Sequence, residues 1–185
     1  TDMGPLVNAE HKQFVTGWIE RSIDEGAELV LDGRTVEVPG HEEGFYVGPT
    51  VFDHVTEEMA CGRDEVFGPV LYVKRVDNFD EGVEVINSSE FANGSSIFTR
   101  SGYHAREFAR RIDGGMVGIN VGIPVPISVF PFSGHKNSFY GDLHVMGRDG
   151  VAFFTETKAV TSYWFDDEAL KGDKVGTWEG TITRS

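Results

Sequence analysis

The chain has 185 residues, a length that suits one ordinary domain or one domain with an appendage. Its 30 acidic residues against 16 Lys and Arg give a formal net charge of −14, which argues against binding to nucleic acids and to anionic membranes. Because hydrophobic residues make up 39% of the chain, we expect a packed core rather than disorder.

In chain order, the first part predicts a helix and several short strands. Asn8 is suited to cap a helix, because apolar residues recur at helical spacing after it. Residues 29–31 and 35–38 flank a turn at 32–34, and this pattern predicts a β-hairpin. A further short strand is expected over residues 50–55.

An alternation of strands and helices follows. The sequence predicts strands at 70–76, 95–99 and 115–121, and helices at 79–88 and 103–112. Strands that alternate with helices are joined by crossover connections. We therefore expect an α/β fold with a mostly parallel sheet and flanking helices.

The last part of the chain does not continue the alternation of strands and helices. Residues 130–140 mix aromatic residues, glycines and a lysine, as a binding loop does. Residues 147–154 predict a short helix, and the β-rich run at 157–165 predicts a strand. Residues 166–185 are charged and weakly patterned, which predicts an irregular tail.

Cysteine and histidine usage bears on compartment and metal binding. Cys61 is the single cysteine, so an intramolecular disulfide is impossible and nothing indicates an oxidising compartment. We therefore expect a cytoplasmic protein. The 6 histidines never fall at i, i+4 spacing with a third ligand nearby, so we expect no metal site. The sequence also lacks the run of about 18 apolar residues that a membrane span needs.

Cys61 is also the obvious candidate for a nucleophile. A catalytic thiolate needs a helix N-terminus, a cation or a histidine to stabilise it. Arg63 is close in sequence and would stabilise a thiolate, but the negative charges of Asp64 and Glu65 would destabilise it. A structural thiol is the favoured interpretation.

Glu65 and Phe67 form a second candidate site, just before the Gly-Pro pair at 68–69 and the strand that follows it. In an extended segment, residues two apart point to the same side. The carboxylate could then accept hydrogen bonds from a vicinal diol while the ring lies beside a flat ring, as binding of a nucleoside requires. The alternative is a loop glutamate and a core phenylalanine.

A set of short motifs resembles those of the aldehyde dehydrogenase superfamily, in the same order and with similar spacing from about residue 2 to residue 165. They are MGP at 3–5, GPTV at 48–51, DEVFGPV at 64–70, NG at 93–94 with SIFT at 96–99, GINV at 118–121, PFSGHK at 131–136 and FTETK at 154–158. Within the superfamily, NVGIPVP at 120–126 and SFYGD at 138–142 resemble the CoA-acylating methylmalonate-semialdehyde dehydrogenases.

This resemblance implies an NAD-dependent enzyme that oxidises methylmalonate or malonate semialdehyde to an acyl-CoA. A cysteine thiolate attacks the aldehyde, hydride passes to NAD, and coenzyme A takes over the resulting thioester. The family's nucleophile corresponds to sequence before residue 1, and Cys61 does not match it. The resemblance therefore implies the C-terminal part of the enzyme, with no catalytic residue in the chain and little expected activity on its own.

The resemblance also implies roles for four residues. Glu65 would hydrogen-bond the nicotinamide ribose, and Phe67 would pack beside the nicotinamide. Asn120 and Phe132 would border the aldehyde pocket, although a purely structural role for either is a real alternative. His11 stands where many relatives place a Gln or Lys near the adenosine, and no role is carried over to it.

For domain organisation, the resemblance implies the C-terminal part of a catalytic domain over residues 1–137 and a returning segment at 138–165, followed by the tail at 166–185. The strand at 157–165 would pair with another subunit's sheet, giving a homodimer or tetramer. Two alternatives remain: a truncated module that acts only in subunit interaction, and an aldehyde dehydrogenase that uses water instead of coenzyme A.

The acidic residues are spread along the whole chain rather than gathered in a tail. They indicate either a surface adapted to high salt or an ordinary acidic cytosolic protein. An enzyme that binds the anions NAD and CoA has no obvious catalytic need for such a surface, so we favour the halophilic interpretation.

Overall fold

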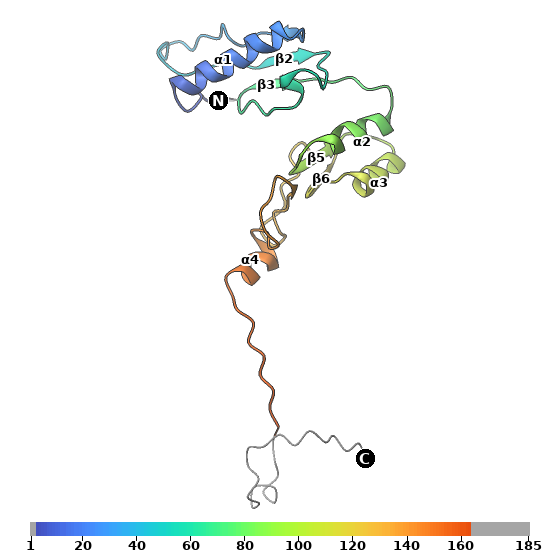
Figure 1. Cartoon of the computed structure of the whole chain (residues 1–185). Coiled ribbons are helices and arrows are strands. Elements are labelled where there is room, and N and C mark those ends of the chain that lie inside the picture. Colours follow the sequence, from blue (N-terminus) through green and yellow to red (C-terminus); the bar gives the residue numbers. More distant parts are fainter. Residues whose placement is uncertain (1–2, 164–185) are drawn as a thin grey trace, which may run out of the picture.

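In the computed structural model, which describes residues 3–163, the chain is α/β, as the strand–helix alternation predicts (Figure 1). The elements in chain order are α1 (Ala9–Asp24), β1 (Glu28–Leu31), β2 (Thr50–Asp53), the 3-10 turn η1 (Ala60–Gly62), β3 (Val70–Tyr72), α2 (Phe79–Ser88), β4 (Phe91–Ala92), β5 (Gly94–Ile97), α3 (Gly102–Arg111), β6 (Met116–Ile119), β7 (His135–Lys136) and α4 (Gly147–Phe153).

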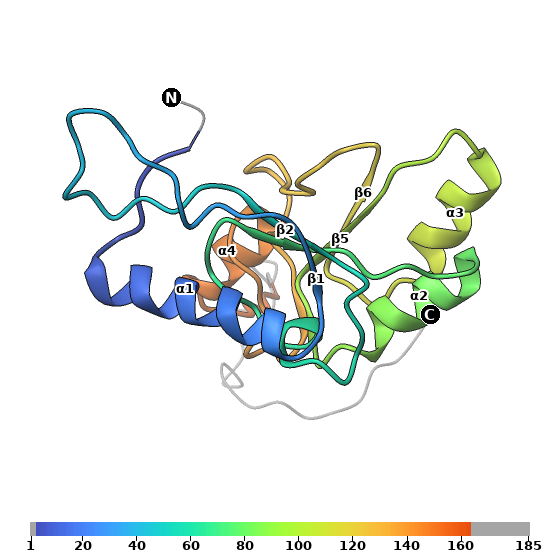
Figure 2. The ribbon, with the colours of Figure 1, turned by 90° about the horizontal axis from the view of Figure 1, so that it is seen from above.

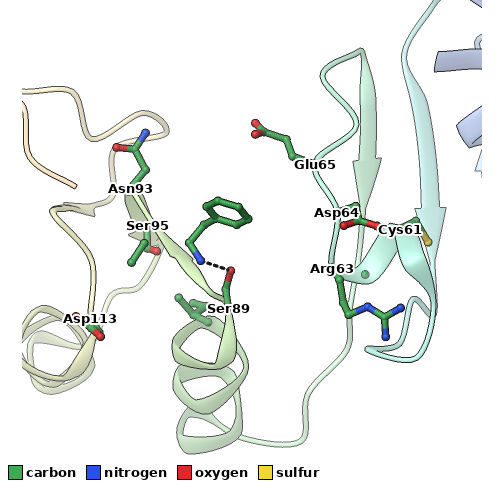
Figure 3. A pocket seen from close by; sticks show the side chains of 13 residues that line it. Cys61, Arg63, Asp64, Glu65, Ser89, Asn93, Ser95 and Asp113 are labelled. Atoms are coloured by element: carbon green, nitrogen blue, oxygen red, sulfur yellow. Dashed lines mark hydrogen bonds between the residues drawn. The ribbon is translucent and has the colours of Figure 1, made fainter. Parts of the chain in front are cut away.

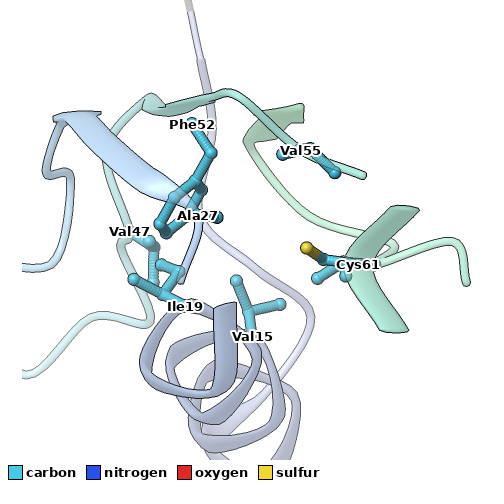
Figure 4. Close-up of a cluster of buried hydrophobic side chains, with 8 residues drawn as sticks. Val15, Ile19, Ala27, Val47, Phe52, Val55 and Cys61 are labelled. Carbon is cyan, nitrogen blue, oxygen red and sulfur yellow. The ribbon is translucent and has the colours of Figure 1, made fainter. Parts of the chain in front are cut away.

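The first core lies between α1 and a sheet of order β1-β2-β3 (Figure 4). Strand β2 is antiparallel to β1 and parallel to β3, with Thr50 opposite Val70. The side chains of Val15, Ile19 and Phe52 are fully buried there. Because these residues come from α1 and the central strand, they join the helix to the sheet.

The second core lies between a parallel pair of strands, β5 and β6, and the helices α2 and α3 (Figures 1 and 2). Its buried residues are Val83 of α2, together with Phe108 and Ile112 at the end of α3. The helix α2 spans the predicted residues 79–88, and Asn78 caps it by accepting a hydrogen bond from the Glu81 amide. Helix α3 begins similarly at Ser101.

The predicted hairpin is wrong, because residues 35–38 form no strand and β1 pairs with β2 instead. The turn at Asp32 is closed locally by hydrogen bonds from Arg34 to the Asp32 carboxylate. The Gly33 amide then donates to the hydroxyl of Thr50, 3.1 Å away. This contact joins the turn after β1 to the first residue of β2, and β2 takes the place beside β1 that the sequence assigns to residues 35–38.

The predicted alternation over residues 70–121 forms, but not as one continuous ladder. Within residues 3–163, β3 pairs with β2, whereas β5 pairs with β6. Between β3 and α2 the chain crosses from the first core to the second (Figure 1). That crossing separates β3 from β5, so the parallel pairs belong to two sheets.

The described part of the chain after β6 is joined to the fold by short stretches of strand pairing. Strands β4 and β7 pair antiparallel, and an isolated bridge joins Phe132 to Val145. The predicted strand at 157–165 is not a strand in its described part, since residues 157–163 are assigned to no strand there. This segment runs away from the rest of the fold, so no sheet edge lies next to it (Figure 1). Residues 164–165 and the expected tail at 166–185 lie outside the described residues.

Candidate functional site

Two clefts meet at Glu65. The larger has a volume of about 580 Å³ and lies between residues 61–65 on one wall and residues 91–95 on the other (Figure 3). The smaller, of about 340 Å³, is lined by Glu65, Phe67 and Tyr72 among others. The clefts thus place the sequence-predicted pair Glu65 and Phe67 at a concave surface.

Glu65 has an exposed side chain whose carboxylate points toward the opposite wall of the larger cleft (Figure 3). No hydrogen bond or ion pair joins it to any residue in the described range 3–163. An ionised carboxylate offers two acceptor oxygens. Glu65 can therefore accept hydrogen bonds from hydroxyl groups of a ligand without losing a contact of the fold.

The segment around Phe67 alternates between the surface and the core. Val66 is only 6% exposed and belongs to the first core, whereas Phe67 is 74% exposed. Glu65 and Phe67 therefore lie on the outer side of a segment whose middle residue is buried. The backbone oxygen of Phe67 accepts a hydrogen bond from Nε2 of His11 at 2.6 Å.

Cys61 lies in η1 beside the larger cleft, but its sulfur faces the interior of the first core (Figure 4). Burial raises the pKa of the Cys61 thiol, and the nearby Glu25 carboxylate adds to this effect. A thiol of this kind is a poor nucleophile at neutral pH. The geometry agrees with the structural interpretation of Cys61.

Asn120 is held at the end of β6 with a left-handed backbone, φ 57°. Its side-chain oxygen accepts from the Thr99 amide at 2.8 Å, and its side-chain nitrogen donates to the Thr99 carbonyl at 3.1 Å. Both ends of the amide are thus used to tie the two strand ends together. Asn120 is not among the residues that line the two clefts.

Phe132 is half-buried, and its amide donates to the Val145 carbonyl at 2.8 Å. It too lies away from the two clefts at Glu65. The structure therefore brings Glu65 and Phe67 together but places neither Asn120 nor Phe132 beside them. The roles of all four residues toward ligands remain predictions.

The sequence did not reveal a polar cluster beside Phe132, centred on His144. Nε2 of His144 lies 3.2 Å from the Ser133 hydroxyl, and Nδ1 lies 3.3 Å from the Asp149 carboxylate. The ring also stacks on Phe139, with centroids 4.1 Å apart. These contacts attach the loop that carries Phe132 to the start of α4.

Within residues 3–163, no group of three His, Cys, Asp or Glu side chains is arranged to hold a metal ion. In the same range, no helix has the length and apolar character needed to cross a bilayer.

A family comparison identifies the architecture around these clefts. The aldehyde dehydrogenase family profile matches residues 1–160, which is most of the chain. The chain belongs to the aldehyde dehydrogenase family. This confirms the family indicated by the motifs that run from MGP to FTETK.

Individual relatives show which members of the family this chain resembles. The aldehyde dehydrogenase chain is 51% identical over 162 residues to malonate-semialdehyde dehydrogenase 2 of Oceanobacillus iheyensis, covering 88% of this chain and 33% of that protein. The crystal structure of methylmalonate-semialdehyde dehydrogenase from Oceanimonas doudoroffii is 45% identical, with a TM-score of 0.88 over 92% of this chain and 35% of that one. These two matches are the basis for the similarity to malonate- and methylmalonate-semialdehyde dehydrogenases.

A structure solved with ligands is also similar. Aldehyde dehydrogenase C of Pseudomonas syringae, as a mutant in complex with NAD+ and octanal, is 37% identical with a TM-score of 0.75, covering 86% of this chain and 32% of that one. The present aldehyde dehydrogenase chain spans about one third of the length of the relatives that it matches.

Proposed function

We propose that this chain is the C-terminal portion of an NAD-dependent, CoA-acylating aldehyde dehydrogenase acting on malonate or methylmalonate semialdehyde. The relatives named malonate- and methylmalonate-semialdehyde dehydrogenase support the substrate class. The observation that carries the proposal is the exposed pair Glu65 and Phe67, which lies at a cleft on a backbone held by α1.

In this proposal, Glu65 and Phe67 hold the nicotinamide end of NAD. The Glu65 carboxylate has no partner within residues 3–163, so both its oxygens are available to the ribose hydroxyls. The exposed ring of Phe67 offers a flat apolar surface for the nicotinamide. When bound, NAD supplies the hydride acceptor, and the part of these two residues is to orient it.

On the aldehyde side, we assign Phe132 to the pocket wall. Asn120 acts more indirectly in this proposal, because both ends of its amide already bind the Thr99 backbone. It keeps the ends of β5 and β6 in place next to the pocket.

The nucleophilic cysteine belongs, in this proposal, to a part of the enzyme outside the 185 residues, since Cys61 is buried with a raised pKa. The acyl group of its thioester would be transferred to the sulfur of coenzyme A, with the cysteine thiolate as leaving group, whereas a relative that uses water would release the free acid. The enzyme is cytoplasmic, and residues 1–137 form its catalytic portion. In this proposal, the segment 138–165 ends in residues 157–165, which become a strand only when they pair with another subunit's sheet.

An assay of the whole enzyme tests this proposal. We expect reduction of NAD with malonate semialdehyde to depend on added coenzyme A and to form an acyl-CoA. Formation of the free acid at the same rate without coenzyme A would contradict the acylating class. Absence of NAD reduction with either semialdehyde would contradict the substrate class.

A further inference from the structure

We propose that His11 is a positioning residue, which holds the backbone of Phe67 so that Phe67 and Glu65 face the cofactor. This inference rests on the proposed function, since it gives His11 a part in the same NAD site.

The His11 ring is itself held in place. Its backbone amide donates to the side-chain oxygen of the helix cap Asn8 at 2.8 Å, so the residue belongs to the capped first turn of α1. The ring stacks on Phe14, with centroids 5.7 Å apart and planes 16° apart. A donor on a fixed ring reaches its acceptor with little loss of side-chain entropy.

The acceptor is the backbone oxygen of Phe67, 2.6 Å from Nε2 of His11. A carbonyl oxygen can only accept, so Nε2 carries the hydrogen in this contact. The bond acts on the peptide group between Phe67 and Gly68. Glycine allows wide rotation of its backbone, so this peptide group needs an external contact to keep one orientation.

A second contact lies one turn further along α1. A Cβ atom added to Gly68 would fall 2.7 Å from Cγ2 of Val15, so the Gly68 backbone lies directly against that fully buried side chain. His11 and Val15 are four residues apart and share one face of the helix. The helix thus contacts the backbone of two successive loop residues.

The His11 bond orients the loop but is not needed to attach it to the core. Val15 and the buried Val66 already attach the loop to the core, so the fold does not depend on the His11 bond. The His11 bond instead fixes the direction of the peptide group that follows the exposed Phe67 ring. Its loss should weaken NAD binding and leave both the fold and the aldehyde pocket unchanged.

The test compares two variants of the whole enzyme. His11→Phe keeps an aromatic ring to stack on Phe14 but has no donor, whereas His11→Gln keeps a side-chain N–H donor. His41→Ala is the control, because His41 is an exposed histidine with no side-chain hydrogen bond or ion pair within residues 3–163, and its ring packs near that of Tyr46. The measurements are the KM values for NAD and for aldehyde, the NAD Kd by fluorescence titration, and the Tm.

We expect His11→Phe to raise the KM and Kd for NAD about 5- to 10-fold, which is the effect of losing about one hydrogen bond. The KM for aldehyde and the Tm should stay at wild-type values. His11→Gln should recover NAD binding to within about twofold of wild type, and His41→Ala should change nothing.

An unchanged Kd for NAD in His11→Phe would overturn the positioning role, as would an equal loss in His11→Phe and His11→Gln. A fall in Tm with equal increases in both KM values would also overturn it, because His11 would then be structural. If the wild-type enzyme itself does not bind NAD, the proposed function fails instead. The two failures are therefore distinguishable.

Discussion

Nε2 of His11 lies 2.6 Å from the backbone oxygen of Phe67, although 56 positions separate the two residues in the chain. The contact joins the first turn of α1 to the loop that precedes β3. Val15 of α1 and Val66 of this loop are buried together in the first core. The packing of a helix on a three-stranded sheet thus sets the position of the two residues that we assign to the cofactor.

Removing the charge of Glu65 should weaken NAD binding. In Glu65→Gln the side chain keeps its size, but the charge-assisted hydrogen bonds to the ribose are lost, so we expect the KM for NAD to rise about 10- to 100-fold. Steady-state kinetics of the whole enzyme would measure this. Glu84→Gln, an exposed glutamate on α2, is the matched control. Wild-type kinetics in Glu65→Gln would remove Glu65 from the site.

The turn after β1 should give a measurable acid dependence. Hydrogen bonds from the Arg34 side chain lower the pKa of Asp32 to about 2. An ordinary aspartate titrates near pH 4, so ionised Asp32 stabilises the fold fully above about pH 4, and this stabilisation is lost as the pH falls toward about 2.

We therefore expect Asp32→Asn to lower the Tm at pH 7, with the difference from wild type shrinking between about pH 4 and about pH 2. Thermal melts by circular dichroism across this range would show it. The exposed Asp142, replaced in the same way, serves as the control. Parallel curves for wild type and Asp32→Asn would contradict the pKa assignment.

Cys61 should matter for packing and not for chemistry. Its side chain is 4% exposed within the first core, so Cys61→Ala should lower the free energy of unfolding by about 1 kcal/mol. The kcat of the whole enzyme should stay at the wild-type value. Denaturant titration and an NAD-reduction assay measure the two effects. A large loss of kcat without loss of stability would make Cys61 functional.

Removing residues 157–185 from the whole enzyme should dissociate the oligomer. Residues 157–162 are assigned to no strand within the described range 3–163, and the Val160 side chain is 74% exposed. An extended segment with an exposed β-branched residue gains stability by adding to a neighbouring sheet. Size-exclusion chromatography with light scattering would measure the mass. A truncated protein that keeps the mass of the wild-type oligomer would refute the assignment.

The acidic surface should make the protein stable in salt. With a formal net charge of −14, screening by KCl reduces repulsion between carboxylates. We expect the Tm to rise as KCl increases from low concentration into the molar range. A Tm that falls over that range would contradict the halophilic interpretation, and an equally charged mesophilic relative is the comparison.

Local features of the sequence were sufficient to predict the helices. Asn8, Asn78 and Ser101 each cap a helix with their side chains, and these caps lie next to the residues they serve. The outward direction of Glu65 and Phe67 also follows from local alternation around Val66. Such features depend on neighbours within about four positions, so one sequence is enough to recognise them.

Which strands pair, and which distant residues contact each other, was decided by the tertiary structure. The hairpin expected after residue 31 is replaced by pairing of β1 with β2, and the Gly33 amide donates a hydrogen bond to the Thr50 hydroxyl across 17 positions. The contact of His11 with Phe67 likewise depends on how α1 packs. Pairing between distant segments is set by which apolar faces are buried together, and periodicity along one segment carries no record of that choice.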